Sequence, residues 1–178
     1  GCGGNLLGYF MFHGGAQPIG NFSTTQESKA SGYSNDYPII SYDFFAPIGE
    51  WGQLRPSYHY FRRLHTFLND FGDLLAPAHP YFPDLKPKGP TDSSVLRFAV
   101  RSKDQHGFVI ISNYQRTIHM NDFPGTQFTL RFSGDSSLQF PQTPITIKSG
   151  VQAIFPFNMQ MGDVQLQYAT AHLFCKLE

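Results

Sequence analysis

Near the start of the chain, His13 is followed directly by two glycines, Gly14 and Gly15. Imidazole titrates near neutral pH, so His13 could contact a substrate, but a histidine can equally serve as a hydrogen-bonded structural residue. Paired glycines allow positive φ or a close backbone approach. They do not form a phosphate-binding loop here, because no Lys-Ser or Lys-Thr pair and no helix start follow at the required spacing. His13 is therefore a candidate for either role.

Three acidic residues, Asp36, Asp43 and Glu50, lie in the polar segment that follows. Two carboxylates about 5 to 5.5 Å apart can hydrolyse a glycosidic bond with retention, one as acid and one as nucleophile. Acidic residues in a solvated loop more often form turns or cap helices, so we do not assign these three as that pair. Asp43, between Tyr42 and Phe44, is the one that we expect to be held in a fixed network.

Other arrangements that carry chemistry are not supported by the sequence. Ser41 lacks the pattern of a nucleophile elbow. Cys2 and Cys175 have no nearby catalytic partner and fit neither a clustered zinc site nor a dense disulfide framework. The seven histidines show no metal-ligand spacing. We therefore expect no metal and no cofactor.

The composition argues against two classes of partner. The 13 Lys and Arg residues balance the 13 Asp and Glu residues, and charged residues make up only 15% of the 178 residues. No basic face is available for phosphate backbones, so nucleic acid is not an expected partner. The longest apolar stretch, residues 6–12, is far shorter than the roughly 18 to 20 residues that span a bilayer, so we expect no membrane span. Aromatic residues make up 16% of the chain, and such rings pack cores and also stack on sugar faces.

The elements that must position these residues begin with the apolar run LLGYFMF at residues 6–12. A continuous run without alternation is typical of a strand buried on both faces of a parallel sheet. No second run of this kind follows, so we infer that the chain is a piece of something longer. In a (β/α)8 barrel the carboxyl ends of the strands form the active site. The segment at residues 13–54 follows such an end and is far longer than the median connection of about 4 to 6 residues.

The rest of the chain changes from a helical to a strand pattern. Pro56 opens a helix expected at residues 57–71, with an apolar stripe and Gly72 as its stop. Five prolines then indicate a domain linker over residues 77–92. Beyond it, period-two segments separated by turn signals predict an antiparallel β-sandwich. Its expected strands are residues 95–100, 108–111, 127–132, 138–140, 145–147, 151–157 and 164–174.

Two motifs in this order resemble a known family. The stretches GNLLGYFMFHGG at residues 4–15 and SYDFFAPIGEWG at residues 41–52 resemble the end of the catalytic barrel of glycoside hydrolase family 35, the β-galactosidase family. Residues 24–77 look closest to the bacterial polysaccharide-degrading branch. The resemblance covers residues 4–77, and more loosely the β-domain as the accessory domain that follows the barrel.

The resemblance implies a mainly β, α+β chain in three parts. Residues 1–76 would be the last βα unit of a (β/α)8 barrel, residues 77–92 the linker, and residues 93–178 the sandwich. The parent enzyme would hydrolyse terminal β-galactosides with retention through two glutamates on earlier barrel strands that this chain does not contain. The chain alone would therefore be inert, and its partners would be a carbohydrate and the remainder of the barrel. The parent would be exported, to the periplasm or the cell exterior.

The resemblance also implies that this chain supplies part of the sugar subsite. The residues carried over are Phe10, His13, Gln17, Tyr42, Asp43 and Phe44. Tyr42 and Asp43 match the family motif. Gln17 follows the glycines where the family continues Thr-Asn-Phe, and Phe10 and Phe44 stand where many members have tyrosine. A lost hydroxyl leaves a sugar hydroxyl unpaired, so a terminal β-sugar other than galactose is an open alternative.

Two other functions remain open from the sequence. The β-domain could act as a carbohydrate-binding or interaction module, and a planar strip of exposed aromatic residues on it would favour that function. A different small enzyme could use Asp43 and Glu50 as its carboxylate pair. For the barrel fragment we expect residues 6–12 to be poorly ordered or adhesive in isolation, because their apolar side chains would lack the missing strands.

Overall fold

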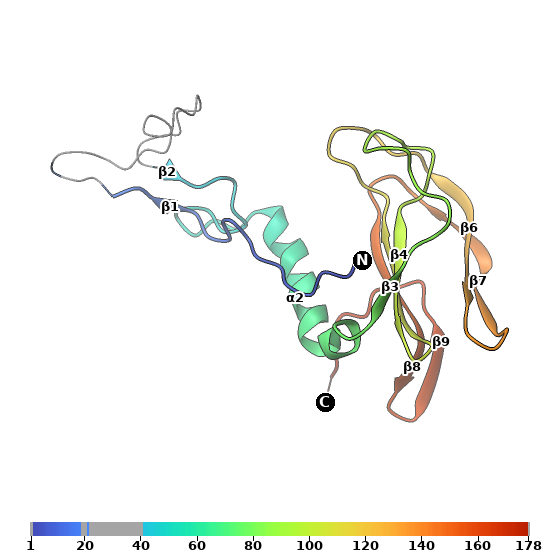
Figure 1. Cartoon of the computed structure of the whole chain (residues 1–178). Helices are drawn as coiled ribbons and strands as arrows, with labels where there is room; N and C mark the ends of the chain where they lie inside the picture. Colours follow the sequence, from blue (N-terminus) through green and yellow to red (C-terminus); the bar gives the residue numbers. More distant parts are fainter. Residues whose placement is uncertain (1, 19–20, 22–40, 178) are drawn as a thin grey trace. The chain divides into compact units, whose positions relative to one another are not determined.

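The computed structural model describes residues 2–18, 21 and 41–177, which form two compact units (Figure 1). One unit is Leu6–Thr66, and the other combines Gly1–Asn5 with Phe67–Glu178. The helix α2 (Pro56–Leu75) has residues in both. The described residues are otherwise mainly strands in antiparallel sheets, as the sequence predicted. Asp36 lies outside the described residues.

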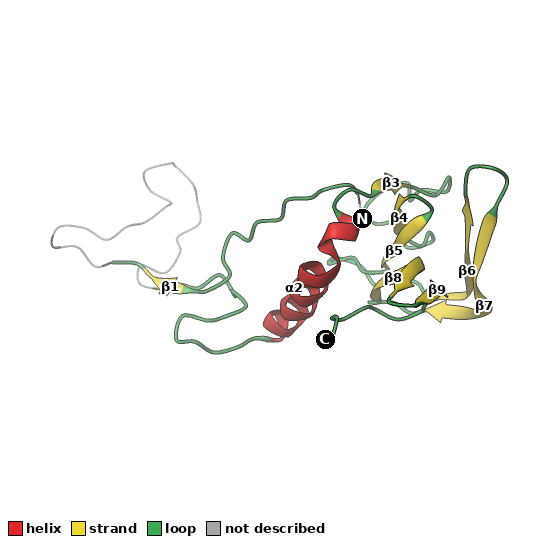
Figure 2. Cartoon of the chain, turned by 90° about the horizontal axis from the view of Figure 1, so that it is seen from below, coloured by secondary structure: helices red, strands yellow, loops and turns green. Residues whose placement is uncertain are grey.

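Seven strands of the larger unit form two antiparallel sheets (Figure 2). A five-stranded sheet has the order β3-β4-β5-β8-β9, and the second sheet pairs β6 with β7. The strands are β3 (His79–Tyr81), β4 (Phe98–Lys103), β5 (His106–Ser112), β6 (Phe123–Arg131), β7 (Ser137–Ile147), β8 (Gln152–Met161) and β9 (Val164–Tyr168).

One hydrophobic core lies between these two sheets. Alternate residues of β5 and β8 meet alternate residues of β6 and β7 in a single cluster. Phe140 and Phe157 are fully buried in it, and their rings lie 6.5 Å apart. Burying a side chain of this size stabilises a fold by about 1.5 to 3 kcal/mol. Alternation along the strands therefore places every second side chain of this stretch in the core.

Several strand boundaries differ from the predicted ones: β4 begins at Phe98 rather than at residue 95, β6 begins at Phe123 rather than at residue 127, and β9 ends at Tyr168 rather than at residue 174. Residues 138–140 and 145–147, expected as two strands, belong to the single strand β7. Its pairing with β6 is irregular, with register shifts on either side of Thr126. Pro141 and Pro144 lie in this stretch, and neither can donate a ladder hydrogen bond. The prolines thus disturb the pairing without ending the strand.

Pro156 lies inside the five-stranded sheet, in β8 between β5 and β9, although proline is usually found at sheet edges and bulges. Its carbonyl accepts a hydrogen bond from the amide of Ala169 at 3.2 Å. Because the amide and carbonyl of one strand residue point to the same side, the missing donor of Pro156 also faces Ala169. That residue follows the last residue of β9, so the proline costs no bond within the ladder.

The proline-rich stretch expected as a linker, residues 77–92, contains β3. This strand pairs with β4 at the edge of the five-stranded sheet, with Pro80 opposite Arg101. A proline is tolerated at an edge because its missing donor faces no further strand. Further along, Asp92 accepts hydrogen bonds from the amides of Lys88 and Ser94, both at 2.9 Å. The stretch is therefore partly built into the sheet.

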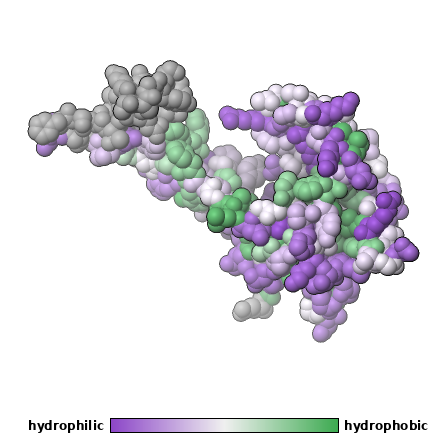
Figure 3. Space-filling view, in the orientation of Figure 1, coloured by the Kyte–Doolittle hydropathy of each residue, from purple (hydrophilic) through white to green (hydrophobic). Residues whose placement is uncertain are grey.

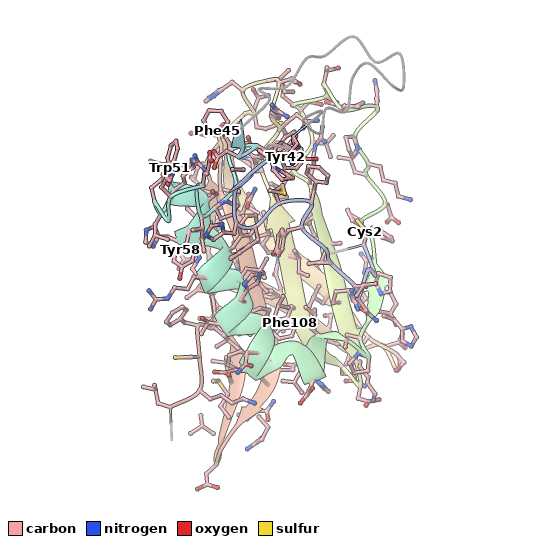
Figure 4. All side chains as sticks on the ribbon, turned by 90° about the vertical axis from the view of Figure 1, so that its left-hand side faces the viewer. Cys2, Tyr42, Phe45, Trp51, Tyr58 and Phe108 are labelled. Atoms are coloured by element: carbon pink, nitrogen blue, oxygen red, sulfur yellow. The ribbon has the colours of Figure 1, made fainter. Side chains whose placement is uncertain are left out.

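The helix α2 begins at Pro56, as expected, but continues past Gly72 to Leu75. Its buried residues are Phe67 and Phe71, and the apolar stripe expected from the sequence contains Phe71 but not Phe67. The Phe67 ring meets Phe108 of β5 edge-on at 5.4 Å, and Figure 4 labels Phe108 on the sheet. Within the larger unit, this contact rather than the stripe fixes the buried side of the helix.

Arg101 explains why the helix continues beyond Gly72. The last turn of α2 contains no basic residue, although cations favour helix C-termini. Arg101 of β4 is 2% exposed. It donates from Nε to the carbonyl of Ala78 at 2.7 Å and from Nη2 to that of Leu75 at 2.9 Å. Its Nη2 also donates to Oδ1 of Asn5 at 3.0 Å. A residue distant in sequence thus supplies the cap.

The strand that we expect at residues 6–12 in a complete barrel is not formed in this structure. These residues form no strand, and Leu6 and Phe10 are 92% and 74% exposed. A strand needs a neighbour for its backbone groups. In the described part of the chain only the end of this segment has one, where the carbonyl of Phe12 accepts a hydrogen bond from the amide of Ile48 at 3.0 Å. On one side of this segment, the Tyr9 ring packs against the Phe61 ring of α2, with 4.6 Å between the ring centroids.

Candidate functional site

The smaller unit brings the two sequence motifs together. Strand β1 (Gly15–Ala16) pairs antiparallel with β2 (Ser41–Tyr42). Beside this pair, the amide of Gly14 donates to the carbonyl of Ile48 at 2.7 Å, and the amide of Ile48 donates to the carbonyl of Phe12 at 3.0 Å. These backbone bonds align the end of the first motif with the second motif.

Asp43 lies at the centre of a hydrogen-bond network, as expected from the sequence. Its Oδ1 accepts from the backbone amide of Glu50 at 2.8 Å, and its Oδ2 accepts from Nη2 of Arg55 at 2.5 Å. Arg55 also donates from Nη1 to the carbonyl of Ala46 at 2.5 Å. The carboxylate and guanidinium thereby hold the whole loop from residue 43 to residue 55.

Gly14 is required for this network. A Cβ at position 14 would lie 2.2 Å from Oδ1 of Asp43 and 2.9 Å from the amide nitrogen of Glu50. Neither group can move without losing the hydrogen bond that joins them. The neighbouring Gly15 has nothing within 4 Å of an added Cβ. The first glycine of the pair therefore serves close approach to Asp43, while the second does not.

A strained turn follows Asp43. The amide of Ala46 donates to the carbonyl of Asp43 at 2.9 Å, and the two central residues, Phe44 and Phe45, have φ values of 47° and 54°. Positive φ at two consecutive aromatic residues is rare and costs about 1 to 2 kcal/mol per residue. Strain of this kind persists only where surrounding contacts impose it. Here the Asp43–Arg55 pair and the Ala46 carbonyl bond supply those contacts.

The turn places Phe44 in a small aromatic cluster with Tyr42 and Phe10. Phe44 meets Tyr42 at 4.6 Å and Phe10 at 5.2 Å between ring centroids, both edge-on. Phe44 is 36% exposed and Phe10 is 74% exposed, so the cluster is open to solvent. Figure 4 shows Tyr42, Phe45 and Trp51 near the N-terminal end of α2. Two distant motifs thus form one aromatic surface.

Six residues were predicted to bind sugar. The structure joins three of them, Phe10, Tyr42 and Phe44, in this cluster. Asp43 begins the turn that carries Phe44. His13 is exposed, and its Nδ1 lies against the carbonyl oxygen of Gly14. Gln17 is half-buried beyond β1, and within the described residues no ring contact or hydrogen bond joins His13 or Gln17 to the cluster. Sequence reasoning missed Arg55, because nothing in the local sequence indicates a partner twelve residues away.

The geometry limits what Asp43 can do chemically. Burial raises its pKa, but the hydrogen bond from Arg55, the amide of Glu50 and the charge of Arg55 together lower it below its ordinary value of 3.8. A carboxylate with a lowered pKa is a poor proton donor at neutral pH. In addition, Asp43 meets the backbone amide of Glu50. Asp43 is therefore an anchoring carboxylate, which disfavours the alternative of an Asp43 and Glu50 acid pair.

The lowered pKa of Asp43 predicts a pH dependence for this loop. Since the folded state binds the proton less tightly than the unfolded state, the contribution of Asp43 is complete above about pH 4 and is lost as the pH falls through the lowered pKa. We expect the amide resonance of Glu50 to titrate in that acidic range in an NMR series from pH 6 to pH 2. Asp43→Asn should abolish this transition, and an unchanged transition in that variant would contradict the assignment.

No protein-family model and no solved structure matches this chain. Among the described residues, no group of three or more His, Cys, Asp and Glu side chains could hold a metal ion. In the same part of the chain, no helix is both long and apolar enough to cross a membrane.

Proposed function

We propose that this chain is part of a retaining exo-β-glycosidase related to glycoside hydrolase family 35. Residues 6–76 would contribute the last βα unit of its barrel, and the two sheets would be the accessory β-sandwich. The proposal rests chiefly on one observation: Phe10, Tyr42 and Phe44, from the two motifs of the resemblance, meet in one open aromatic cluster. Open rings of this kind suit the apolar face of a sugar.

The exposed apolar residues of this unit support the same proposal. Leu6, Leu7 and Phe10 are 92%, 68% and 74% exposed, and hydrophobic residues lie at the surface of this part of the molecule (Figure 3). Adjoining exposed apolar side chains mark a surface that another protein segment or a ligand covers. In the proposed parent enzyme, neighbouring barrel strands cover residues 6–12, which then form the eighth strand.

In this proposal the residues have distinct roles. The rings of Phe10, Tyr42 and Phe44 form one wall of the sugar subsite, and His13 and Gln17 lie at its rim. Asp43 acts indirectly, since it is held by Arg55 and fixes the turn that presents Phe44. The catalytic glutamates belong to the remainder of the barrel.

The proposal is tested by expressing the reading frame that extends upstream of residue 1. We expect it to encode a barrel-length segment, and the complete protein to hydrolyse 4-nitrophenyl β-glycosides. The chain of 178 residues should show no turnover. In the complete protein, Phe44→Tyr should raise kcat/KM for the galactoside relative to other β-glycosides, because the added hydroxyl can pair with a sugar hydroxyl.

A matched control keeps the test specific. Tyr114 is 51% exposed and lies outside the smaller unit, so Tyr114→Phe should leave the substrate preference unchanged. Enzymatic turnover by the 178-residue chain alone would refute the proposal. A start codon directly before residue 1, with no barrel segment encoded, would refute it too.

A further inference from the structure

A groove lies in the larger unit between the β3–β4 edge of one sheet and β6 of the other. It has a volume of about 1050 Å³, at the upper end of the roughly 300 to 1,000 Å³ of small-molecule sites. Residues of β3, β4 and β6 line it, together with the segment after β3 and the β4–β5 turn. It shares no residue with the aromatic cluster of the smaller unit.

Two consecutive aromatic residues, Tyr81 and Phe82, form part of this lining. They are 56% and 51% exposed, although aromatic residues elsewhere in this unit mostly fill its core. Tyr81 ends β3 opposite Val100, so the edge of the sheet holds it at the groove. The Phe82 ring has Lys86 Nζ at 6.0 Å on one side. Aromatic side chains fixed on a strand end offer contact area at little entropic cost.

The polar lining is charged but balanced. Asp84 and Asp104 face the groove with Lys103 and Arg131, so the formal charges cancel. These four side chains are exposed, and within the described part of the chain none of them has a hydrogen bond or ion pair with a protein group. Their donors and acceptors are therefore available to a ligand. A polyanion would need an excess of positive charge, and an apolar ligand would desolvate four charged groups without compensation.

We propose that this groove binds a neutral oligosaccharide. Sugars present an apolar face of C–H groups, which Tyr81 and Phe82 can contact, and hydroxyls that both donate and accept hydrogen bonds. Carboxylates accept and guanidinium or ammonium groups donate, so Asp84, Asp104, Lys103 and Arg131 can satisfy both kinds of hydroxyl contact. The groove would hold a polysaccharide chain at a site separate from the proposed glycosidase subsite.

The test measures the binding of oligosaccharides to the 178-residue chain, monitored by NMR chemical shifts and by calorimetry. The probes are β-1,4-galactotetraose, cellohexaose and xylohexaose, with dextran sulfate as the charged comparison. We expect saturable binding of at least one neutral probe, with shifts centred on residues 102–105 and 129–133. Tyr81→Ala should weaken this binding at least about tenfold, which corresponds to about 1.4 kcal/mol. Arg131→Gln, a milder change, should also weaken it.

The controls separate this proposal from the proposed enzyme function. Tyr114→Ala removes a ring of similar exposure outside the groove, and Tyr42→Ala alters the other site, so both should leave binding unchanged. Absence of saturable binding for all three neutral probes would overturn the proposal. Binding that survives both Tyr81→Ala and Arg131→Gln, or that is lost in Tyr42→Ala, would overturn it too, as would preferential binding of dextran sulfate in the groove.

Discussion

Arg101→Met is expected to lower the free energy of unfolding of the larger unit by about 3 to 5 kcal/mol. The variant removes hydrogen bonds to the carbonyls of Ala78 and Leu75 and to the side chain of Asn5. Methionine has a similar reach but no donor, so the carbonyl of the buried residue Ala78 loses this partner, and the carbonyl of Leu75 keeps only the amide of Ala78 at 3.2 Å. A loss of this size is a large part of the roughly 5 to 15 kcal/mol that stabilises a typical domain.

Urea unfolding measures this effect by circular dichroism. Arg116→Met is the matched control, because Arg116 is exposed and no side-chain hydrogen bond of it is found among the described residues. That variant should change stability by less than about 0.5 kcal/mol. Hydrogen exchange of the last turn of α2 should also accelerate in Arg101→Met. A stability change below about 1 kcal/mol would show that Arg101 does not cap the helix.

Gly14→Ala is expected to destabilise the loop of the smaller unit by about 2 to 4 kcal/mol. The added Cβ would lie 2.2 Å from Oδ1 of Asp43, so the carboxylate must move away from the amide of Glu50. The expected result is faster hydrogen exchange at the amides of Gly14, Ile48 and Glu50, by roughly 30- to 1,000-fold. Phe44 should also lose its fixed position, since the turn depends on Asp43.

Gly15→Ala is the control for this variant. It adds the same methyl group one residue later, where nothing lies within 4 Å, and should leave these exchange rates within about threefold. Equal effects of the two substitutions would mean that glycine is needed at position 14 for its flexibility and not for the close approach to Asp43. In the glycosidase that we propose, Gly14→Ala should also reduce turnover through loss of the Phe44 position.

These contacts show which parts of the site could be inferred from the sequence. Tyr42, Asp43 and Phe44 were identified from their motif, and Asp43 was expected to be anchored. Arg55 was not identified, because an ion pair between distant residues leaves no local pattern. The distinct roles of Gly14 and Gly15 were also hidden, since both glycines satisfy the same sequence rule.

The fold shows the same division. Periodicity identified the antiparallel strands and the start of α2 at Pro56, because side-chain alternation and proline geometry are local properties. The apolar run at residues 6–12 forms no strand here, since such a run indicates burial without stating which partner provides it. Periodicity also ended α2 too early, at Gly72, because the capping side chain of Arg101 comes from β4.

By itself, the sequence determined which residues are apolar, where turns interrupt the strands and which motif carries the candidate site. These depend on backbone preferences and on the spacing of neighbouring residues. Only the tertiary structure decided that Asp43 pairs with Arg55, that Arg101 caps α2 and that Tyr81 and Phe82 line a groove. Each of these needs groups distant in the chain to meet, and that meeting is a property of the packed molecule.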